Sequence, residues 1–229
     1  MKNTYYTAVG HFRRRTNEGG QSYPVIIVSR QEYPVDIQEM AVWSILSWQL
    51  LNLAQIKEKY EQLAKELPPM EQRTLDMCLT RLQMRGLVSA GTGDTDFEAI
   101  YDLLGGLYVV PLAESLPLRL AAFLKLICGG IPFSKARQLF RQDKPDERER
   151  QVMELARQAL LSTAELIKCA EVGARDVSTG EKIMEALYND DDTTSENIMY
   201  EMLNAKHREP VTLAVANLYL RKQIIFERV

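Results

Sequence analysis

The sequence predicts a mainly α-helical fold with a minor β component. A β-hairpin pattern opens the chain, three helical segments with tight connections follow it, and helical periodicity dominates the second half. These observations divide the 229 residues into three parts. We expect a β-hairpin arm over 1–34, a three-helix unit closed by a strand over 35–114, and an all-α domain over 115–229.

The overall charge gives no general attraction for nucleic acid. The chain carries 28 Lys and Arg against 31 Asp and Glu, a net charge of -3. Any contact with phosphate must therefore come from a local basic cluster. With 46% hydrophobic residues, the composition is that of a folded protein with a sizeable core.

The cysteines and histidines predict neither disulfides nor a metal site. Cys78, Cys128 and Cys169 are an odd number and lie far apart, each in a helical apolar pattern, which indicates reduced thiols and a cytoplasmic setting. His11 and His207 have no cysteine near them in the sequence, so no zinc spacing is present. We expect no cofactor, and no stretch is long and apolar enough to predict a membrane span.

The predicted hairpin ends its first strand in a basic triplet. Its strands are expected at Thr4–Phe12 and Ser22–Arg30, on either side of a Gly-Gly turn. Two interpretations of the triplet stay open: a contact with a phosphate backbone, or a solvated strand end that discourages edge pairing. The triplet is Arg13, Arg14 and Arg15.

Three helices are predicted between residues 35 and 86. Asp36 can cap the first, which is apolar on most sides, and Asn52 can cap the second, over Leu53–Leu67. The third starts near Pro68 and stops at Gly86. One buried stripe is expected along the third helix, made of Leu75, Cys78, Leu79 and Leu82.

The end of the third helix carries a family resemblance. Directly after Arg85 and Gly86 come Leu87 and Val88, which favour a strand. A leucine-striped helix closing in Arg-Gly-Leu-Val resembles the recognition helix and first wing strand of bacterial winged-helix transcriptional regulators, the MarR-like and PadR-like families. The resemblance covers 35–112. It implies a winged helix-turn-helix domain that binds double-stranded DNA.

The candidate DNA contacts follow from the face of this helix. Residues near its start are types that read base edges, and nearby cations are placed to reach phosphates. The predicted contacts are Gln72, Arg73, Thr74, Thr80, Arg81 and Arg85 on the helix, Lys57 and Lys59 on the preceding one, and Arg13, Arg14 and Arg15. Met77 and Met84 share the outward face and suit a protein partner instead.

The pattern departs from a winged helix at the wing. After Gly93, the capping cluster Asp94, Thr95 and Asp96 begins a short helix where a return strand is expected. The next strand pattern is at Leu107–Leu112. That strand either completes a wide wing or pairs with the N-terminal hairpin.

The second half is predicted to be helical. Helices are expected over 118–128, 132–141 and 146–171; the last repeats Met153, Leu160 and Ile167 at intervals of seven. By the resemblance, the 146–171 helix is a candidate for a homodimer interface; the alternative is an intramolecular core helix.

The tail at 178–229 again shows three helices and a strand. Aligning Leu82, Leu87 and Val88 with Tyr219, Ile224 and Ile225 gives a degenerate second helix-turn-helix. Convergence of amphipathic patterns is the alternative.

Catalytic and calcium motifs are missing from the sequence. The acidic run at 190–201 has the ligand spacing of a calcium loop, but Ser195 stands where the loop needs glycine, so we interpret it as a helix-capping loop. No nucleophile elbow or phosphate-binding loop is present, and we expect no enzyme activity. The predicted function is a sequence-specific DNA-binding transcriptional regulator acting as a dimer. The alternative is a winged-helix protein-interaction module that does not bind DNA.

Overall fold

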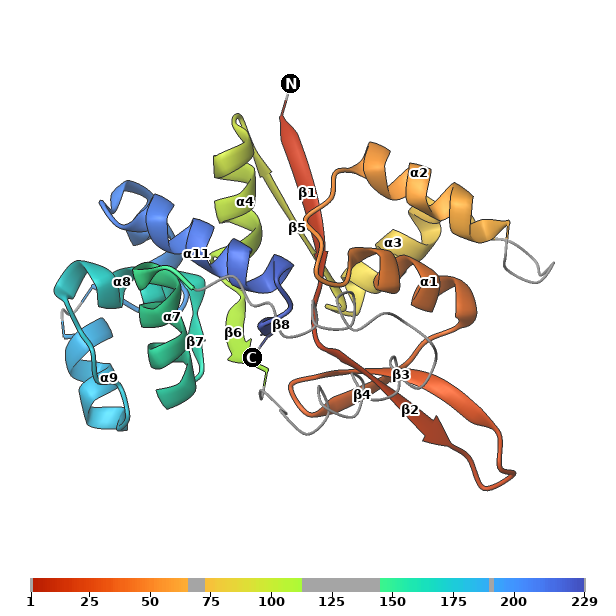
Figure 1. The fold of residues 1–229 in the computed structure, drawn as a ribbon, viewed down its shortest axis with the longest axis horizontal. Helices are drawn as coiled ribbons and strands as arrows, with labels where there is room; N and C mark the ends of the chain where they lie inside the picture. Colours follow the sequence, from red (N-terminus) through yellow and green to blue (C-terminus); the bar gives the residue numbers. More distant parts are fainter. Residues whose placement is uncertain (1, 66–72, 113–144, 190–191, 229) are drawn as a thin grey trace, which may run out of the picture.

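The fold is mixed α/β, with more β structure than the sequence predicted. The computed structural model describes residues 2–65, 73–112, 145–189 and 192–228 (Figure 1). The structure is about 49% helical and 22% strand. The helices predicted over 118–128 and 132–141 lie outside the described residues, as does Gln72.

The first half contains three helices packed against a two-stranded antiparallel sheet. Its elements are β1 (Asn3–Ala8), α1 (Ile37–Leu46), α2 (Leu53–Ala64), α3 (Leu75–Met84) and β5 (Val88–Gly93). β1 pairs with β5, and on its other side Tyr6 forms a bridge with Leu51 in the α1–α2 connection. β1 is therefore the middle segment, although it comes first in the chain.

The predicted hairpin strand Thr4–Phe12 is split between two sheets. A second, three-stranded antiparallel sheet follows β1, with β3 in the middle. Its strands are β2 (His11–Thr16), β3 (Ser22–Val28) and β4 (Gln31–Pro34). The split occurs at Gly10, whose φ of +83° turns the chain, and a Cβ there would lie 2.3 Å from the carbonyl oxygen of Ile27. The turn thus sets β1 and β2 in different sheets.

A helix stands where a wing would extend. β5 runs into α4 (Asp96–Leu104), which folds back over the β1–β5 sheet. Gly91 and Gly93 allow this close approach, because a Cβ on Gly91 would lie 2.1 Å from the backbone nitrogen of Leu103. β6 (Tyr108–Pro111) then pairs neither with β5 nor with the N-terminal hairpin, so both expected pairings of this strand were wrong.

The second half adds two strands to β6. Its elements are α7 (Glu147–Gln158), β7 (Leu161–Ser162), α8 (Thr163–Val172), α9 (Gly180–Leu187), α10 (Ile198–Glu201), the 3-10 turn η2 (Met202–Asn204), α11 (Arg208–Leu220) and β8 (Ile224–Glu227). The third sheet has the order β7-β6-β8. The second half is therefore not all-α, and this sheet spans the boundary predicted at residue 114.

The helix predicted over 146–171 is two helices. α7 ends at Ala159, whose backbone is extended (φ −147°, ψ 157°), and Ser162 caps α8 through the backbone N–H of Glu165. Because the chain changes direction here, the seven-residue repeat of Met153, Leu160 and Ile167 does not form one seam. Met153 and Ile167 are buried in the core, whereas Leu160 is exposed.

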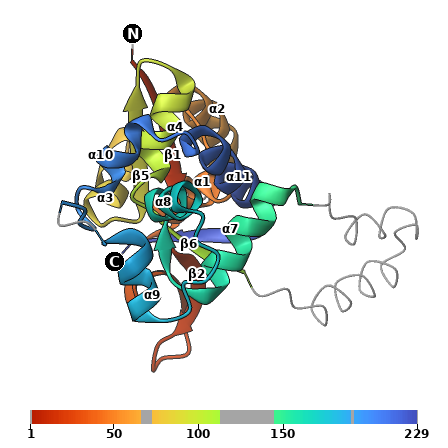
Figure 2. The ribbon, with the colours of Figure 1, turned by 90° about the vertical axis from the view of Figure 1, so that its left-hand side faces the viewer.

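The two halves repeat one arrangement. In each, a middle strand precedes a first helix, a short strand segment, a second helix, a third helix and a last strand (Figure 1). Figure 2 shows the molecule from the side of the second half, with α7, α8 and α11 toward the viewer. The strand pairs correspond as well. The bridge between Tyr6 and Leu51 in the first half matches the pair Val109–Leu161 in the second. The pair Ala8–Val88 in the first half matches Pro111–Ile224 in the second. We call these the first unit (β1, α1, α2, α3, β5) and the second unit (β6, α7, β7, α8, α11, β8).

The first two helices of both units match without a gap. Asp36 corresponds to Asp146, Glu39 to Glu149, Asn52 to Ser162 and Gln55 to Glu165. Within each helix, the two residues form a capping box: Asp36 with Glu39, Asp146 with Glu149, Asn52 with Gln55, and Ser162 with Glu165. The predicted second helix-turn-helix at 178–229 therefore holds only the third helix and last strand of the second unit.

The third-helix ends also match. Arg85 and Arg221 are the C-caps of α3 and α11, and Gly86 and Lys222 follow with φ of +70° and +60°. The correspondence differs by one residue from the predicted alignment, since Leu82 matches Leu218 rather than Tyr219.

The two units share one core. Tyr219 of α11 is buried against the first unit, where its hydroxyl accepts hydrogen bonds from the Thr7 hydroxyl and the Trp48 backbone N–H, each at 2.9 Å. Burial raises the pKa of Tyr219 to about 12. Within the described ranges, no helix combines the length and apolar character of a membrane span.

Replacing Gly91 with alanine tests the packing of α4 on β5. The added Cβ meets backbone atoms that cannot rotate away, so we expect the free energy of unfolding to fall by about 3 kcal/mol or more in urea denaturation. Gly180→Ala is the matched control, because nothing lies within 4 Å of its Cβ position. Equal stability of the Gly91→Ala chain and the wild type would contradict this packing.

Candidate interaction surface on the third helix

α3 buries one stripe and exposes the opposite face. Thr74 caps its start by accepting a hydrogen bond from the Met77 backbone N–H at 3.3 Å. The predicted buried stripe is confirmed at Cys78, Leu79 and Leu82, and Leu75 is half-buried. The exposed residues on the other side are Asp76, Met77, Thr80, Arg81 and Met84, which we call the α3 outer face.

A buried carboxylate on α1 fixes the orientation of α3. The Glu39 side chain is only 2% exposed. Its Oε1 accepts a hydrogen bond from Arg81 Nε at 2.7 Å, and its Oε2 accepts from a terminal guanidinium nitrogen of Arg85 at 3.1 Å. The Asp36 backbone N–H also donates to Oε2, at 3.3 Å. Both carboxylate oxygens are thus occupied, and the two arginines lie one turn apart on α3.

Arg73 is held by the start of α1. Its guanidinium donates to Asp36, and its backbone N–H donates to Oε1 of Gln38 at 3.1 Å. Burial alone would raise the Asp36 pKa, but hydrogen bonds from the Glu39 backbone and the Arg73 side chain lower it below its ordinary value. The predicted base-reading arginine is therefore part of the contact between α1 and α3.

The remaining predicted cations do not form one strip. Arg13 and Arg14 are neighbours on β2, so their side chains point to opposite faces of the sheet. Arg15 pairs with Glu32 of β4. Lys57 and Lys59 are exposed on α2. The basic residues named from the sequence are thus divided among separate places, and Arg15, Arg73, Arg81 and Arg85 bind carboxylates of this chain.

The described residues contain no group of metal ligands or reactive thiols. No cluster of three His, Cys, Asp or Glu is arranged to hold a metal ion among them. Burial raises the pKa of the Cys78 thiol, and raises that of Cys169 to about 12, so both stay protonated. In the acidic loop, Asp190 lies outside the described residues, and Glu201 accepts a hydrogen bond from the Thr193 hydroxyl at 2.7 Å.

The second unit repeats the buried carboxylate and keeps a narrower exposed face. The Glu149 side chain is 1% exposed, and its Oε2 accepts a hydrogen bond from Arg221 at 2.8 Å. Glu149 and Arg221 correspond to Glu39 and Arg85. α11 is buried along most of its length, at Val211, Thr212, Ala214, Val215, Ala216, Leu218 and Tyr219. The counterparts of Met77 and Met84 are Leu213 and Leu220, which are 43% and 46% exposed. Of the two third helices, α3 therefore has the broader outer face.

Sequence reasoning missed the two carboxylates. The signal was present, since Asp-x-x-Glu stands at the start of each first helix and an arginine stands at the end of each third helix. Arg81 and Arg85 were assigned to DNA because the pattern of α3 alone does not show that Glu39, on α1, is their partner. Comparison with protein-family models, with characterised proteins and with solved structures finds no match to this chain.

Replacing Glu39 with glutamine tests the role of the carboxylate. The substitution keeps the shape but leaves the Arg81 and Arg85 guanidiniums without a counter-charge, so we expect a loss of about 3 kcal/mol in the free energy of unfolding. Glu58→Gln, on the exposed face of α2, is the control and should change stability by less than about 0.5 kcal/mol. Similar small changes in both variants would show that Glu39 does not hold α3.

Proposed function

We propose that this chain is a protein-interaction module made of two winged-helix-like units, with the α3 outer face as its contact surface. The observation that carries the proposal is the exposure of two methionines beside arginines that are already bound. Met77 is 53% exposed and Met84 is 83% exposed. Arg81 and Arg85 bind Glu39, and Arg73 binds Asp36.

The order of elements supports a winged-helix-like description. Three helices are followed by a strand, and the α1–α2 connection adds a bridge to the same sheet. The departure is that the middle strand, β1, comes from before α1 instead of returning after β5. The second unit has the same departure with β6. One chain then carries two such units, which supports a pseudo-dimer within the chain in place of a homodimer.

The chemistry of the α3 outer face favours a polypeptide over a duplex. Base readout needs side-chain donors and acceptors that are free to reach base edges. Among the described residues of this face, the side chains of Asp76 and Thr80 and the terminal nitrogens of Arg81 make no hydrogen bond, and Asp76 repels phosphate. Methionine side chains are flexible and polarisable, and they suit apolar protein contacts. The expected partner presents an apolar strip, such as one face of an amphipathic helix.

The loop that would form a wing also opposes phosphate binding. β5 ends at Gly93, and Asp94, Thr95 and Asp96 then start α4. Asp96 accepts hydrogen bonds from Asn3 at 2.7 Å and from the Tyr5 hydroxyl at 2.9 Å. This end of the β1–β5 sheet is therefore acidic and tied to the N-terminal strand.

A photo-crosslinking amino acid at position 80 tests the proposal in the cells that naturally make the chain. We expect one discrete adduct with a polypeptide, insensitive to nuclease, because position 80 lies between the two methionines. The combination Met77→Glu and Met84→Glu should remove the adduct, because it places two charges in an apolar contact. The same crosslinker at Met184, which is 57% exposed on α9, is the control.

Two outcomes of that experiment would contradict the proposal. One is an adduct that persists unchanged in the double glutamate variant. The other is an equal adduct from position 184. Circular dichroism and thermal melting of the variant should match the wild type, since both methionine side chains are exposed.

Double-stranded DNA, bound sequence-specifically by a transcriptional regulator, is the second candidate. The observation in its favour is that Lys57, Lys59, Arg13 and Arg14 are exposed, with no ion pair between them and any part of the chain that the structure describes. Under this candidate, these four side chains are the ones that contact phosphates.

A gel-shift titration on random duplexes at low salt separates the two candidates. Under the protein-interaction proposal, no retarded complex forms. A complex that weakens as salt rises, and that weakens on every duplex alike in the Lys57→Ala and Lys59→Ala double variant, would establish DNA as the ligand. Glu58→Gln, between the two lysines, is the control for changes in the surface of α2.

A further inference from the structure

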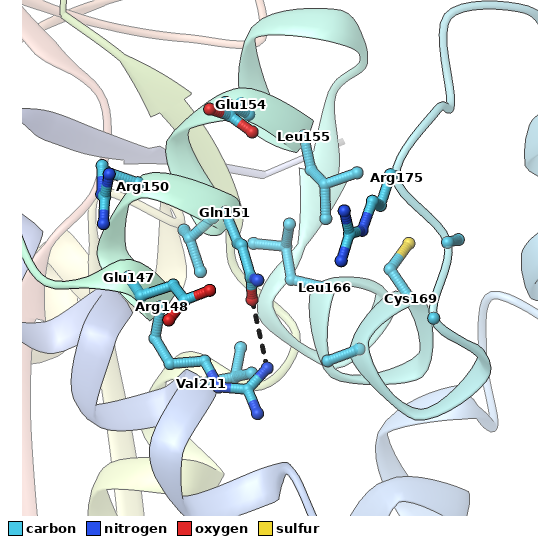
Figure 3. Close-up of a pocket in the computed structure, with 14 residues that line it drawn as sticks. Glu147, Arg148, Arg150, Gln151, Glu154, Leu155, Leu166, Cys169, Arg175 and Val211 are labelled. Carbon is cyan, nitrogen blue, oxygen red and sulfur yellow. Dashed lines mark hydrogen bonds between the residues drawn. The ribbon is translucent and has the colours of Figure 1, made fainter.

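A cavity lies in the second unit. It has a volume of about 430 Å³ and lies between α7 and α8, with one side closed by Val211 of α11 (Figure 3). Its apolar lining comes from Val152, Leu155, Leu166, Cys169, Ala170 and Val211. This volume falls in the range of small-molecule sites in proteins.

The correspondence between the units shows why the cavity is there. Ala170 of α8 matches Tyr60 of α2, and Gly173 matches Leu63. Tyr60 packs against the core of the first unit. Its pKa is raised first by burial and then by the nearby Cys78 and Asp36. Among the described residues, the second unit has only small residues, Ala170 and Gly173, at the positions of these larger side chains.

The charged groups around the cavity favour an anion. Figure 3 shows the Arg175 guanidinium directed toward Leu155 and Leu166. No hydrogen bond or ion pair joins it to another residue of the described chain. Arg148 donates to Oε1 of Gln151 at 3.1 Å and lies 3.4 Å from Nδ1 of His207. The other charged lining residues are Glu147, Arg150 and Glu154.

The Cys169 thiol in the lining of this cavity is a poor nucleophile. Its side chain is buried, and its pKa is raised to about 12 by burial and by the neighbouring Glu165. A thiol with that pKa is protonated at neutral pH and is a poor nucleophile. The cavity is therefore suited to reversible binding.

We propose that this cavity binds a small aromatic carboxylate. Its ring takes the place that the Tyr60 ring has in the first unit, against Leu166, Ala170 and Val211. Its carboxylate pairs with Arg175, and Arg148 is the second cation at the opening. Arginine suits this role because its planar guanidinium binds a carboxylate through two parallel hydrogen bonds. The site is independent of the partner at the α3 outer face.

The experiment is a calorimetric titration of the full chain with 4-hydroxyphenylacetate and with uncharged 4-methylphenol. We expect saturable binding of the acid, at least tenfold tighter than binding of the phenol. Arg175→Gln should remove this preference, so that the acid and the phenol bind with similar affinity. Arg157→Gln, on an exposed part of α7 outside the cavity lining, is the matched control and should behave as the wild type.

A second variant tests the location. Ala170→Tyr restores the side chain of the first unit, so it should weaken acid binding at least tenfold and raise the melting temperature. Saturable binding that is unchanged in Ala170→Tyr, or no saturable binding to the wild type, would overturn the proposal. An unchanged preference for the acid in Arg175→Gln would overturn it as well.

Discussion

The structure depends on a buried carboxylate at the start of the first helix of each unit. Glu39 and Glu149 are the third residues of α1 and α7, and both are withdrawn from solvent. A carboxylate in that position destabilises the fold unless cations and hydrogen-bond donors surround it. Arginines from the third helix and the capping backbone N–H meet this need in both units. In both units, the same contact between a buried carboxylate and an arginine therefore fixes the orientation of the first helix relative to the third.

The same buried carboxylate has different consequences in the two units. In the first unit, the Glu39 carboxylate holds α3 with its methionines outward. Arg81 and Arg85 bind this carboxylate and are therefore less available to bind a phosphate backbone. In the second, α11 is turned inward, and Tyr219 joins it to β1 and to the α1–α2 connection. Its third helix keeps a narrower exposed face, at Leu213 and Leu220. Its distinctive feature is the space left by Ala170 and Gly173, where the first unit has larger side chains.

Local features of the fold could be predicted from the sequence, and long-range ones could not. The caps at Asp36 and Asn52, the helix stop at Gly86 and the outward methionines all follow from residues close together in the chain. The pairing of β1 with β5 joins segments about 85 residues apart, and nothing in either strand pattern selects that partner. The break at Ala159 was hidden because its neighbours are good helix formers.

The candidate site was predicted only in part, for the same reason. Exposure of Thr80, Met77 and Met84 follows from helical periodicity, but the partners of the arginines lie on another helix. The duplication was also obscured in the sequence. Lys222 takes the left-handed position that Gly86 holds in the first unit. The glycine that marks the end of α3 in the sequence is therefore replaced by a lysine at the end of α11.

Double-mutant cycles across Glu39–Arg85 and Glu149–Arg221 measure how strongly each carboxylate is coupled to the third helix. Each cycle compares the free energies of unfolding of the wild type, two single glutamine variants and the double variant. We expect a coupling energy of at least about 1.5 kcal/mol in both units, as for other close and desolvated charge pairs. Additive losses in either unit, with a coupling below about 0.3 kcal/mol, would contradict a shared buried contact.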